Sequence, residues 1–167
     1  QIVGERPLQP FVDIGAHDFY DRLREAPELP TTSQPTPQDF LDAFEELAGY
    51  ERIYALQLSA RLSGTFQSSF LAAAEIGGDR IQVVDTETAS LAVGLLALAI
   101  QRRLARGTTD EEIAALIERF KQENGVVFTV GTLEYLQKGG RFGRAQAMAG
   151  TILNVKPILS VEDGVIL

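Results

Sequence analysis

Short apolar runs alternate with longer helical stretches through the middle of the chain. Three runs have the length and the flanking residues of buried strands: 52–59, 80–84 and 126–132. Three stretches between and after them have helical patterns: 66–75, 89–106 and a segment that begins at Thr108 or Thr109. With short connections, the order strand, helix, strand, helix, helix, strand predicts an α/β fold in which helices cover both faces of a mostly parallel sheet.

The last part of the chain changes character. Residues 133–138 and 143–153 have helical patterns, and Asp163-Gly164 between two apolar runs predicts a β-hairpin. An antiparallel hairpin after a parallel unit predicts the start of a second α/β domain near Gly125. We therefore expect most of an N-terminal α/β domain over 1–124, without its first strand, and the truncated beginning of a C-terminal domain over 125–167.

The amino-acid composition indicates a globular protein and argues against several kinds of partner and site. Hydrophobic residues make up 45% and charged residues 23%, which is typical of a globular fold. A formal net charge of −8 argues against a nucleic-acid partner, because such binding begins with a basic surface. The sequence has no cysteine, so disulfides and thiolate metal sites are excluded and a cytoplasmic location is favoured. The longest apolar stretch, 89–100, is too short to predict a membrane span.

Loops rich in hydroxyl groups precede three of the predicted helices. In the first loop, Thr36 has the pattern of an N-cap, with Pro37 in the first turn and Asp39 completing a capping box. Three hydroxyl residues precede that cap and have no such explanation: Thr31, Thr32 and Ser33. They belong either to a solvated polar loop or to a binding site.

The second loop, Leu62-Ser63-Gly64-Thr65, directly follows a predicted buried strand. Gly64 permits close approach of a ligand or a positive φ, while the hydroxyls of Ser63 and Thr65 and the N–H groups of the helix start are donors for an anion. An ordinary serine cap is the alternative. The third loop, 85–90, carries acidic residues, so helix capping by Thr86 accounts for it better than anion binding.

Residues 90–100 are apolar nearly all the way round a helix, which is typical of a helix buried on all sides. One interpretation is a central core helix, in which the helix-weakening Gly94 indicates close packing. The other is that one face lines an apolar tunnel, and we assign four residues to that lining: Leu91, Gly94, Leu95 and Leu98.

A basic stretch follows near the end of the chain. No acidic residue occurs between Tyr135 and Val161, whereas four basic ones do: Lys138, Arg141, Arg144 and Lys156. Such a stretch forms a solvated basic face, an anion site or a docking patch for an acidic partner. Arg141 is the best placed for an anion site, because two glycines precede it and guanidinium suits carboxylate geometry.

Catalysis has little support in the sequence. His17 is the sole histidine and lies in a polar stretch, which is typical of a surface residue. No cluster of His, Asp and Glu has metal-ligand spacing, and no Gly-x-Ser-x-Gly, Walker or Rossmann glycine pattern occurs. We expect no catalytic residue, no metal and no cofactor.

Four motifs in register resemble the DegV family of bacterial fatty-acid-binding proteins: Thr-Thr-Ser-Gln-Pro-Thr-Pro at 31–37, Leu-Ser-Gly-Thr-Phe-Gln-Ser at 62–68, 132–141 ending in Gly-Gly-Arg, and Leu-Asn-Val-Lys-Pro-Ile-Leu at 153–159. The resemblance implies two α/β domains, with an acyl chain in a tunnel and its carboxylate near the domain junction. It implies that Thr32 and Ser63 bind the carboxylate and that Arg141 borders it. Ser33, Gly64 and Thr65 complete the expected ligand-binding set.

The resemblance also implies a carrier rather than an enzyme. A separate dihydroxyacetone-kinase-like fatty acid kinase would phosphorylate the bound carboxylate to an acyl phosphate for phospholipid synthesis. The family's first strand and a His-containing glycine-rich loop fall outside this sequence, so we expect the chain alone to bind fatty acid weakly. Two alternatives stay open: a metabolic hydrolase or phosphotransferase with catalytic groups outside these residues, and a regulatory protein that docks through its basic stretch.

Overall fold

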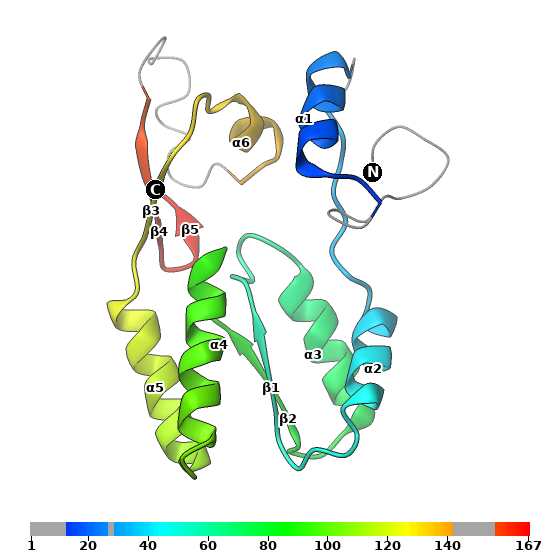
Figure 1. The fold of residues 1–167 in the computed structure, drawn as a ribbon, viewed down its shortest axis with the longest axis vertical. Coiled ribbons are helices and arrows are strands. Elements are labelled where there is room, and N and C mark those ends of the chain that lie inside the picture. The colour runs from blue at the N-terminus through cyan, green and yellow to red at the C-terminus, as the bar shows by residue number, and fades with distance from the viewer. Residues whose placement is uncertain (1–12, 27–28, 142–155) are drawn as a thin grey trace. The chain divides into compact units, whose positions relative to one another are not determined.

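The computed structural model of the 167-residue chain describes residues 13–26, 29–141 and 156–167 (Figure 1). The chain divides into two compact units, Gln1–Gln34 and Pro35–Leu167. Helix α1 (Ala16–Glu25) lies in the first unit, and none of its residues is buried. The second unit contains the other described elements: α2 (Pro37–Glu46), β1 (Ile53–Gln57), α3 (Thr65–Ile76), β2 (Ile81–Asp85), α4 (Leu91–Leu104), α5 (Asp110–Glu123), β3 (Val126–Thr129), α6 (Glu134–Lys138), β4 (Ile158–Glu162) and β5 (Val165–Ile166).

Helices α2 and α5 begin where their capping residues predict. Thr36 and Thr109 are the N-caps, and each forms a capping box with an acidic residue three positions later. In the first box, hydrogen bonds from the backbone N–H and the hydroxyl of Thr36 lower the pKa of Asp39. Helix α4 is followed by Gly107 at a φ of 77°, as expected for a glycine after a helix end.

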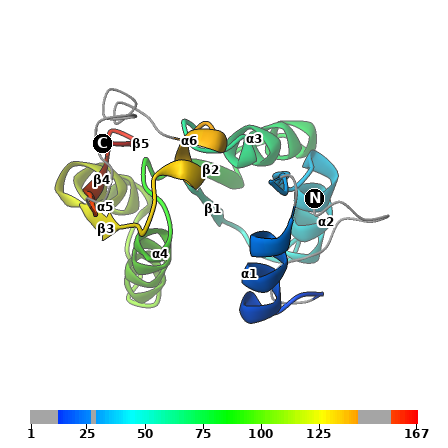
Figure 2. The same cartoon turned by 90° about the horizontal axis from the view of Figure 1, so that it is seen from above.

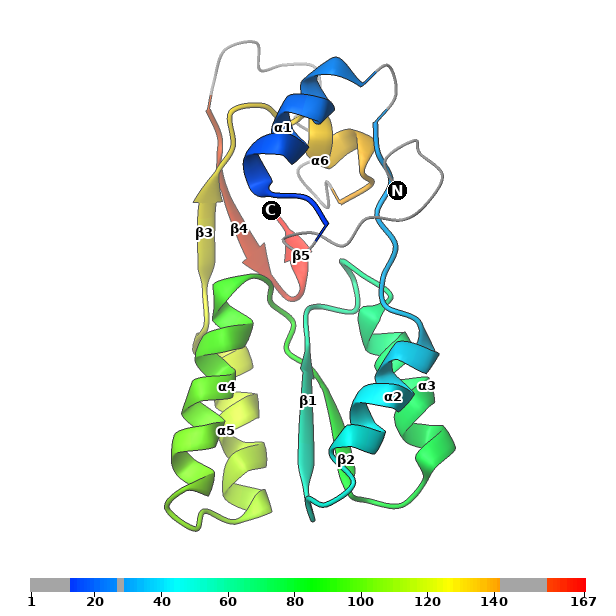
Figure 3. The same cartoon turned by 45° about the vertical axis from the view of Figure 1, so that its right-hand side comes forward.

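Strands β1 and β2 form a parallel pair in which Ile53 is opposite Ile81 and Gln57 is opposite Asp85. Figure 2 and Figure 3 show the pair between α2 and α3 on one face and α4 and α5 on the other. Each face has its own apolar core. The core toward α2 and α3 contains Phe44, Ile53, Ala55 and Ala72, and the core toward α4 and α5 contains Leu96, Ile100, Ile113 and Ile117. The prediction of a parallel sheet with helices on both faces is confirmed.

A second sheet has the strand order β3-β4-β5, and both of its pairings are antiparallel. The predicted hairpin is confirmed: Asp163 and Gly164 have φ values of 50° and 76°, as a two-residue type I′ turn requires. The third apolar run therefore does not extend the parallel sheet, because β3 pairs with β4. The domain boundary near Gly125 stays a prediction, and the helix expected over 143–153 lies outside the described residues.

Helix α4 buries one stripe of its surface. Ala92, Leu96 and Ile100 are at most 6% exposed, whereas Leu91 is 74% exposed and Leu95 is 56% exposed. The buried stripe packs against α5 and the parallel sheet, and the described part of the chain leaves the other face uncovered. The prediction of burial on all sides is wrong for this structure, because a uniformly apolar helix can still meet neighbours on one side alone. None of the described helices is long and apolar enough to span a membrane.

Candidate functional site

The loops after β1 and β2 join at the carboxyl edge of the parallel sheet, which is where open α/β sheets bind ligands. The N–H of Ser59 donates a hydrogen bond of 2.8 Å to the carbonyl of Thr88. The N–H of Ala60 donates one of 3.2 Å to the Asp85 Oδ1 atom. These two contacts fix the backbone after β1 against the loop after β2.

The loop after β2 has a strained backbone that buried hydrogen bonds hold. Glu87 and Ser90 have φ values of 54° and 60°, a conformation that costs residues other than glycine roughly 1–3 kcal/mol each. Thr86, which is 1% exposed, donates a hydrogen bond of 2.8 Å from its hydroxyl to the carbonyl of Gln57. The predicted capping role of Thr86 is therefore wrong, because its side chain faces back into β1, and α4 begins without a side-chain cap.

Ser63 and Thr65 place two hydroxyl groups together at the start of α3. Their oxygen atoms lie 2.8 Å apart, and Ser63 Oγ accepts a hydrogen bond of 3.3 Å from the N–H of Thr65. Gly64 is the N-cap, and its φ of −72° shows that the glycine is not used for a positive φ here. The first turn of α3 has no acidic residue, and its N–H groups lack intrahelical partners, so the helix start favours a negative charge.

A tight turn at Ser59 positions this hydroxyl pair. The Ser59 carbonyl accepts hydrogen bonds of 3.0 Å and 3.1 Å from the N–H groups of Leu62 and Ser63. The Ser59 side chain is fully buried, and its hydroxyl donates a hydrogen bond of 2.7 Å to the carbonyl of Gly164 in the β4–β5 turn. We call residues 59–65 the hydroxyl turn. Its first half is attached to the parallel sheet and to the hairpin of the second sheet.

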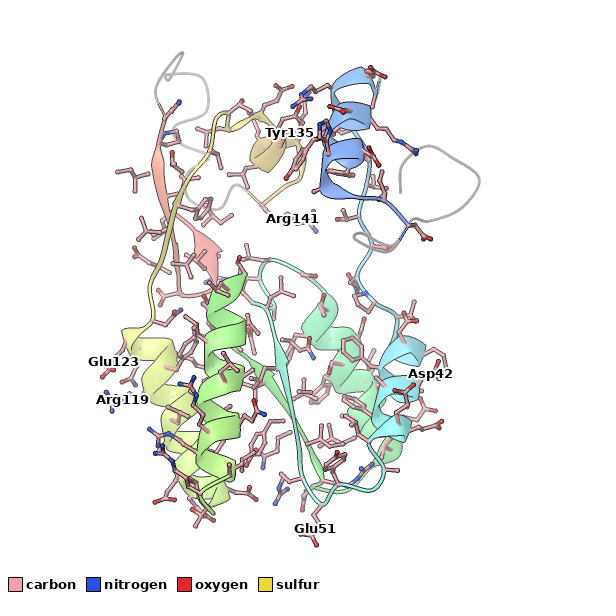
Figure 4. The ribbon with its side chains drawn as sticks, viewed as in Figure 1. Asp42, Glu51, Arg119, Glu123, Tyr135 and Arg141 are labelled. Atoms are coloured by element: carbon pink, nitrogen blue, oxygen red, sulfur yellow. The ribbon has the colours of Figure 1, made fainter. Side chains whose placement is uncertain are left out.

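Arg141 approaches the hydroxyl turn from the residues after α6 (Figure 4). Its Nε donates a hydrogen bond of 3.2 Å to the carbonyl of Leu62, next to Ser63. Its Nη1 donates one of 2.6 Å to the carbonyl of Gly139, and the neighbouring Gly140 has a φ of 69° that lets the chain turn back. The structure therefore adds an exposed guanidinium to the two hydroxyls and the helix start.

The family model described as "Uncharacterised protein, DegV family" matches residues 2–167. The chain belongs to the DegV family. It is 39% identical over 155 residues to a DegV domain-containing protein of Caldanaerobacter subterraneus, and the match covers 92% of this chain and 55% of that relative. The chain thus spans about half the length of the DegV relatives it matches.

Solved structures of fatty-acid-binding proteins have the same fold. A fatty-acid-binding DegV protein from Thermus thermophilus is 42% identical and has a TM-score of 0.86, over 93% of this chain and 56% of that one. A stearic-acid-binding protein from Eubacterium ventriosum is 28% identical with a TM-score of 0.82, over 94% of this chain and 56% of that one. The resemblance drawn from the four motifs is confirmed at the level of family and fold.

The remaining expected DegV site residues are distributed along the chain. Thr32 and Ser33 are exposed in the irregular stretch at the end of the first unit, and their meeting with Ser63 stays a prediction. In the second unit, Leu91, Gly94, Leu95 and Leu98 share the exposed face of α4. Apart from its chain neighbours and the backbone of its own helix, no atom of the described residues lies within 4 Å of the place where a Cβ on Gly94 would stand, so the close packing expected there is not found. Contact of this face with an acyl chain stays a prediction.

The basic residues of the stretch have different surroundings where the structure describes them. Lys138 forms an ion pair of 2.5 Å with Glu134 one helical turn earlier, Lys156 is exposed, and Arg144 lies outside the described residues. The side chain of His17 is 88% exposed and lies 2.8 Å from the carboxylate of Asp21. No group of three His, Asp or Glu residues suited to a metal ion occurs in the described ranges. Within the described part of the basic stretch, Arg141 donates a hydrogen bond to the hydroxyl turn.

Proposed function

We propose that this DegV protein binds a long-chain fatty acid and holds its carboxylate at the hydroxyl turn. The observation that carries the proposal is the pair of hydroxyls of Ser63 and Thr65, 2.8 Å apart at a helix start without acidic residues. The exposed guanidinium of Arg141 lies beside the same turn. One hydroxyl of the pair donates to the other, which leaves one hydroxyl, the helix-start N–H groups and the guanidinium as donors, and a carboxylate accepts several hydrogen bonds at once.

The hydrocarbon chain of the ligand supplies most of the affinity. A sixteen-carbon acid has about fourteen methylenes, and at ~0.8 kcal/mol each their gross transfer from water is on the order of 11 kcal/mol. The exposed apolar face of α4, with leucines at positions 91, 95 and 98, offers one wall for the chain. The head-group donors then orient the carboxylate, and in this proposal Thr32 and Ser33 add to them.

The protein is, in this proposal, a cytoplasmic carrier rather than an enzyme. It presents the carboxylate to a dihydroxyacetone-kinase-like fatty acid kinase, which transfers a phosphoryl group to form the acyl phosphate used in phospholipid synthesis. The described groups of the hydroxyl turn suit this role, because hydroxyls and a guanidinium hold a carboxylate without attacking it. The partner supplies the nucleotide and the chemistry.

Solvent extraction and mass spectrometry of the purified full-length protein test the proposal. We expect one C14–C18 fatty acid per molecule. A protein that is empty on purification and binds no added fatty acid contradicts lipid binding. The carrier role is tested separately by adding the kinase and ATP and trapping acyl phosphate as a hydroxamate. Lipid that is bound but never phosphorylated under these conditions contradicts the carrier role alone.

A further inference from the structure

Residues far apart in the sequence hold the hydroxyl turn in place. Ser59 is 0% exposed, and its Oγ both donates to the Gly164 carbonyl over 2.7 Å and accepts from the N–H of Arg61 over 3.1 Å. The guanidinium of Arg61 donates a second hydrogen bond, of 3.0 Å, to the carbonyl of Asp163. The β4–β5 turn is therefore attached to the hydroxyl turn at two successive carbonyls.

The fit between Ser59 and the hairpin has no spare room. A Cβ added to Gly164 would lie 2.5 Å from Ser59 Oγ, which is closer than such atoms approach in proteins. A larger residue at 164 must therefore displace Ser59. The Ser59 carbonyl accepts hydrogen bonds from the N–H groups of Leu62 and Ser63. A displacement of Ser59 would therefore also move the backbone that carries the Ser63 hydroxyl.

We propose that Ser59 is a positioning residue for the head-group site. By binding the hydroxyl turn to the β4–β5 hairpin, Ser59 keeps the Ser63 hydroxyl in the orientation that binds the ligand carboxylate. This inference rests on the proposed function and extends it. We expect no direct contact between the Ser59 side chain and the ligand, because Ser59 is 0% exposed. Its loss therefore weakens recognition of the carboxylate and leaves the contacts of the hydrocarbon chain intact.

The test compares hexadecanoic acid with its methyl ester, which keeps the chain and removes the negative charge. Ser59→Ala is expected to lower the affinity of the delipidated full-length protein for the acid about tenfold and for the ester less than twofold. The matched control is Ser69→Ala. Ser69 is also 0% exposed, and its hydroxyl accepts a hydrogen bond from the Gln57 side chain. This variant is expected to leave the ratio of the two affinities unchanged.

A second pair of variants tests the contact from the hairpin. Gly164→Ala combines a positive φ of 76° with the clash against Ser59, whereas Gly107→Ala has a φ of 77° and open space around its Cβ. We expect only Gly164→Ala to reduce the ratio of acid to ester affinity. It remains the test if Ser59→Ala fails to fold.

The outcomes separate the inference from the function on which it rests. A wild-type protein that binds neither acid nor ester contradicts the proposed function, and the inference falls with it. A wild type that prefers the acid, with the same preference in Ser59→Ala and Gly164→Ala, contradicts the positioning role alone. Equal loss of acid and ester affinity in either variant reduces Ser59 to a general structural residue.

Discussion

Tyr54 and Asp110 connect the start of β1 to the first turn of α5 through a hydrogen bond of 2.5 Å from the tyrosine hydroxyl to the carboxylate. Arg52 forms an ion pair with the same carboxylate. Partial burial, followed by the hydrogen bond to Asp110, raises the pKa of Tyr54 to about 12. The hydrogen bond from Tyr54 lowers the pKa of Asp110. This cluster lies at the end of β1 away from the hydroxyl turn, so it affects stability without touching the site.

The raised pKa of Tyr54 predicts a loss of stability at alkaline pH. The folded protein favours the neutral phenol, so its contribution is complete below the ordinary pKa of 10 and is lost as the pH rises toward about 12. Tyr54→Phe is expected to remove this part of the pH dependence, measured by urea unfolding between pH 8 and pH 11. Tyr50→Phe, a change at a 64% exposed tyrosine, is the control. Identical pH profiles for wild type and Tyr54→Phe would contradict the prediction.

Replacing Ser63 tests the hydroxyl pair directly. Ser63→Ala removes the acceptor for the Thr65 N–H, which costs roughly 0.5–2 kcal/mol of stability as other helix-start hydroxyls do. In the proposed complex it also removes one hydrogen bond to the charged carboxylate, worth about 1.5–3 kcal/mol, so we expect kinase-dependent acyl phosphate formation to fall more than lipid retention. Thr36→Ala removes the cap of α2 and is the matched control for stability. Equal loss of phosphotransfer and lipid retention in Ser63→Ala would contradict the prediction that Ser63 orients the carboxylate while the hydrocarbon chain supplies most of the affinity.

Arg141 is predicted to act on the head group by charge. Its side chain is exposed, so Arg141→Gln is expected to change the free energy of unfolding by no more than about 0.5 kcal/mol. Affinity for hexadecanoic acid should fall several-fold at low salt and less at high salt, because ions screen an exposed charge. Arg119→Gln removes another exposed arginine, one paired with Glu123 on α5, and serves as the control (Figure 4). A wild-type salt profile in Arg141→Gln would exclude the role.

The parts of the fold that the sequence predicts depend on signals within a few residues of one another. The capping boxes at Thr36 and Thr109 span three residues each, and the Asp163-Gly164 turn needs only its two positive φ values. Each of these is decided by local backbone chemistry, which is why a single sequence reveals it. The hydroxyl pair of Ser63 and Thr65 is likewise formed by residues only two positions apart.

Long-range partners are what the sequence could not provide. The residues of an apolar run such as β3 do not indicate whether it joins a parallel or an antiparallel sheet. Its antiparallel pairing with β4 is what determines this. The contact of Ser59 with Gly164 joins residues 105 positions apart, and a lone serine after a strand gives no sign of it. The hydrogen bond of the Thr86 hydroxyl could not be predicted either, because its acceptor is the carbonyl of Gln57 on the neighbouring strand.

Adjacent leucines on α4 provide a last, internally controlled prediction. Leu96 is 0% exposed and lies in the core with α5, so Leu96→Ala is expected to cost roughly 2–5 kcal/mol of stability. Leu95 is 56% exposed, so Leu95→Ala should change stability by no more than about 0.5 kcal/mol. If its face lines the acyl chain, the same change lowers affinity roughly threefold to tenfold, from about 0.8 kcal/mol for each methylene left uncovered.

This loss should be equal for hexadecanoic acid and its methyl ester, because the hydrocarbon chain is common to both ligands. Changes at the proposed head-group site, such as Ser63→Ala, are expected to lower the affinity for the acid more than that for the ester. The two measurements together therefore distinguish residues that contact the hydrocarbon chain from residues that contact the carboxylate. Leu104→Ala, at another exposed leucine of α4 outside the assigned lining, is the control. Wild-type affinity for both ligands in Leu95→Ala would show that the exposed face of α4 covers something other than the acyl chain.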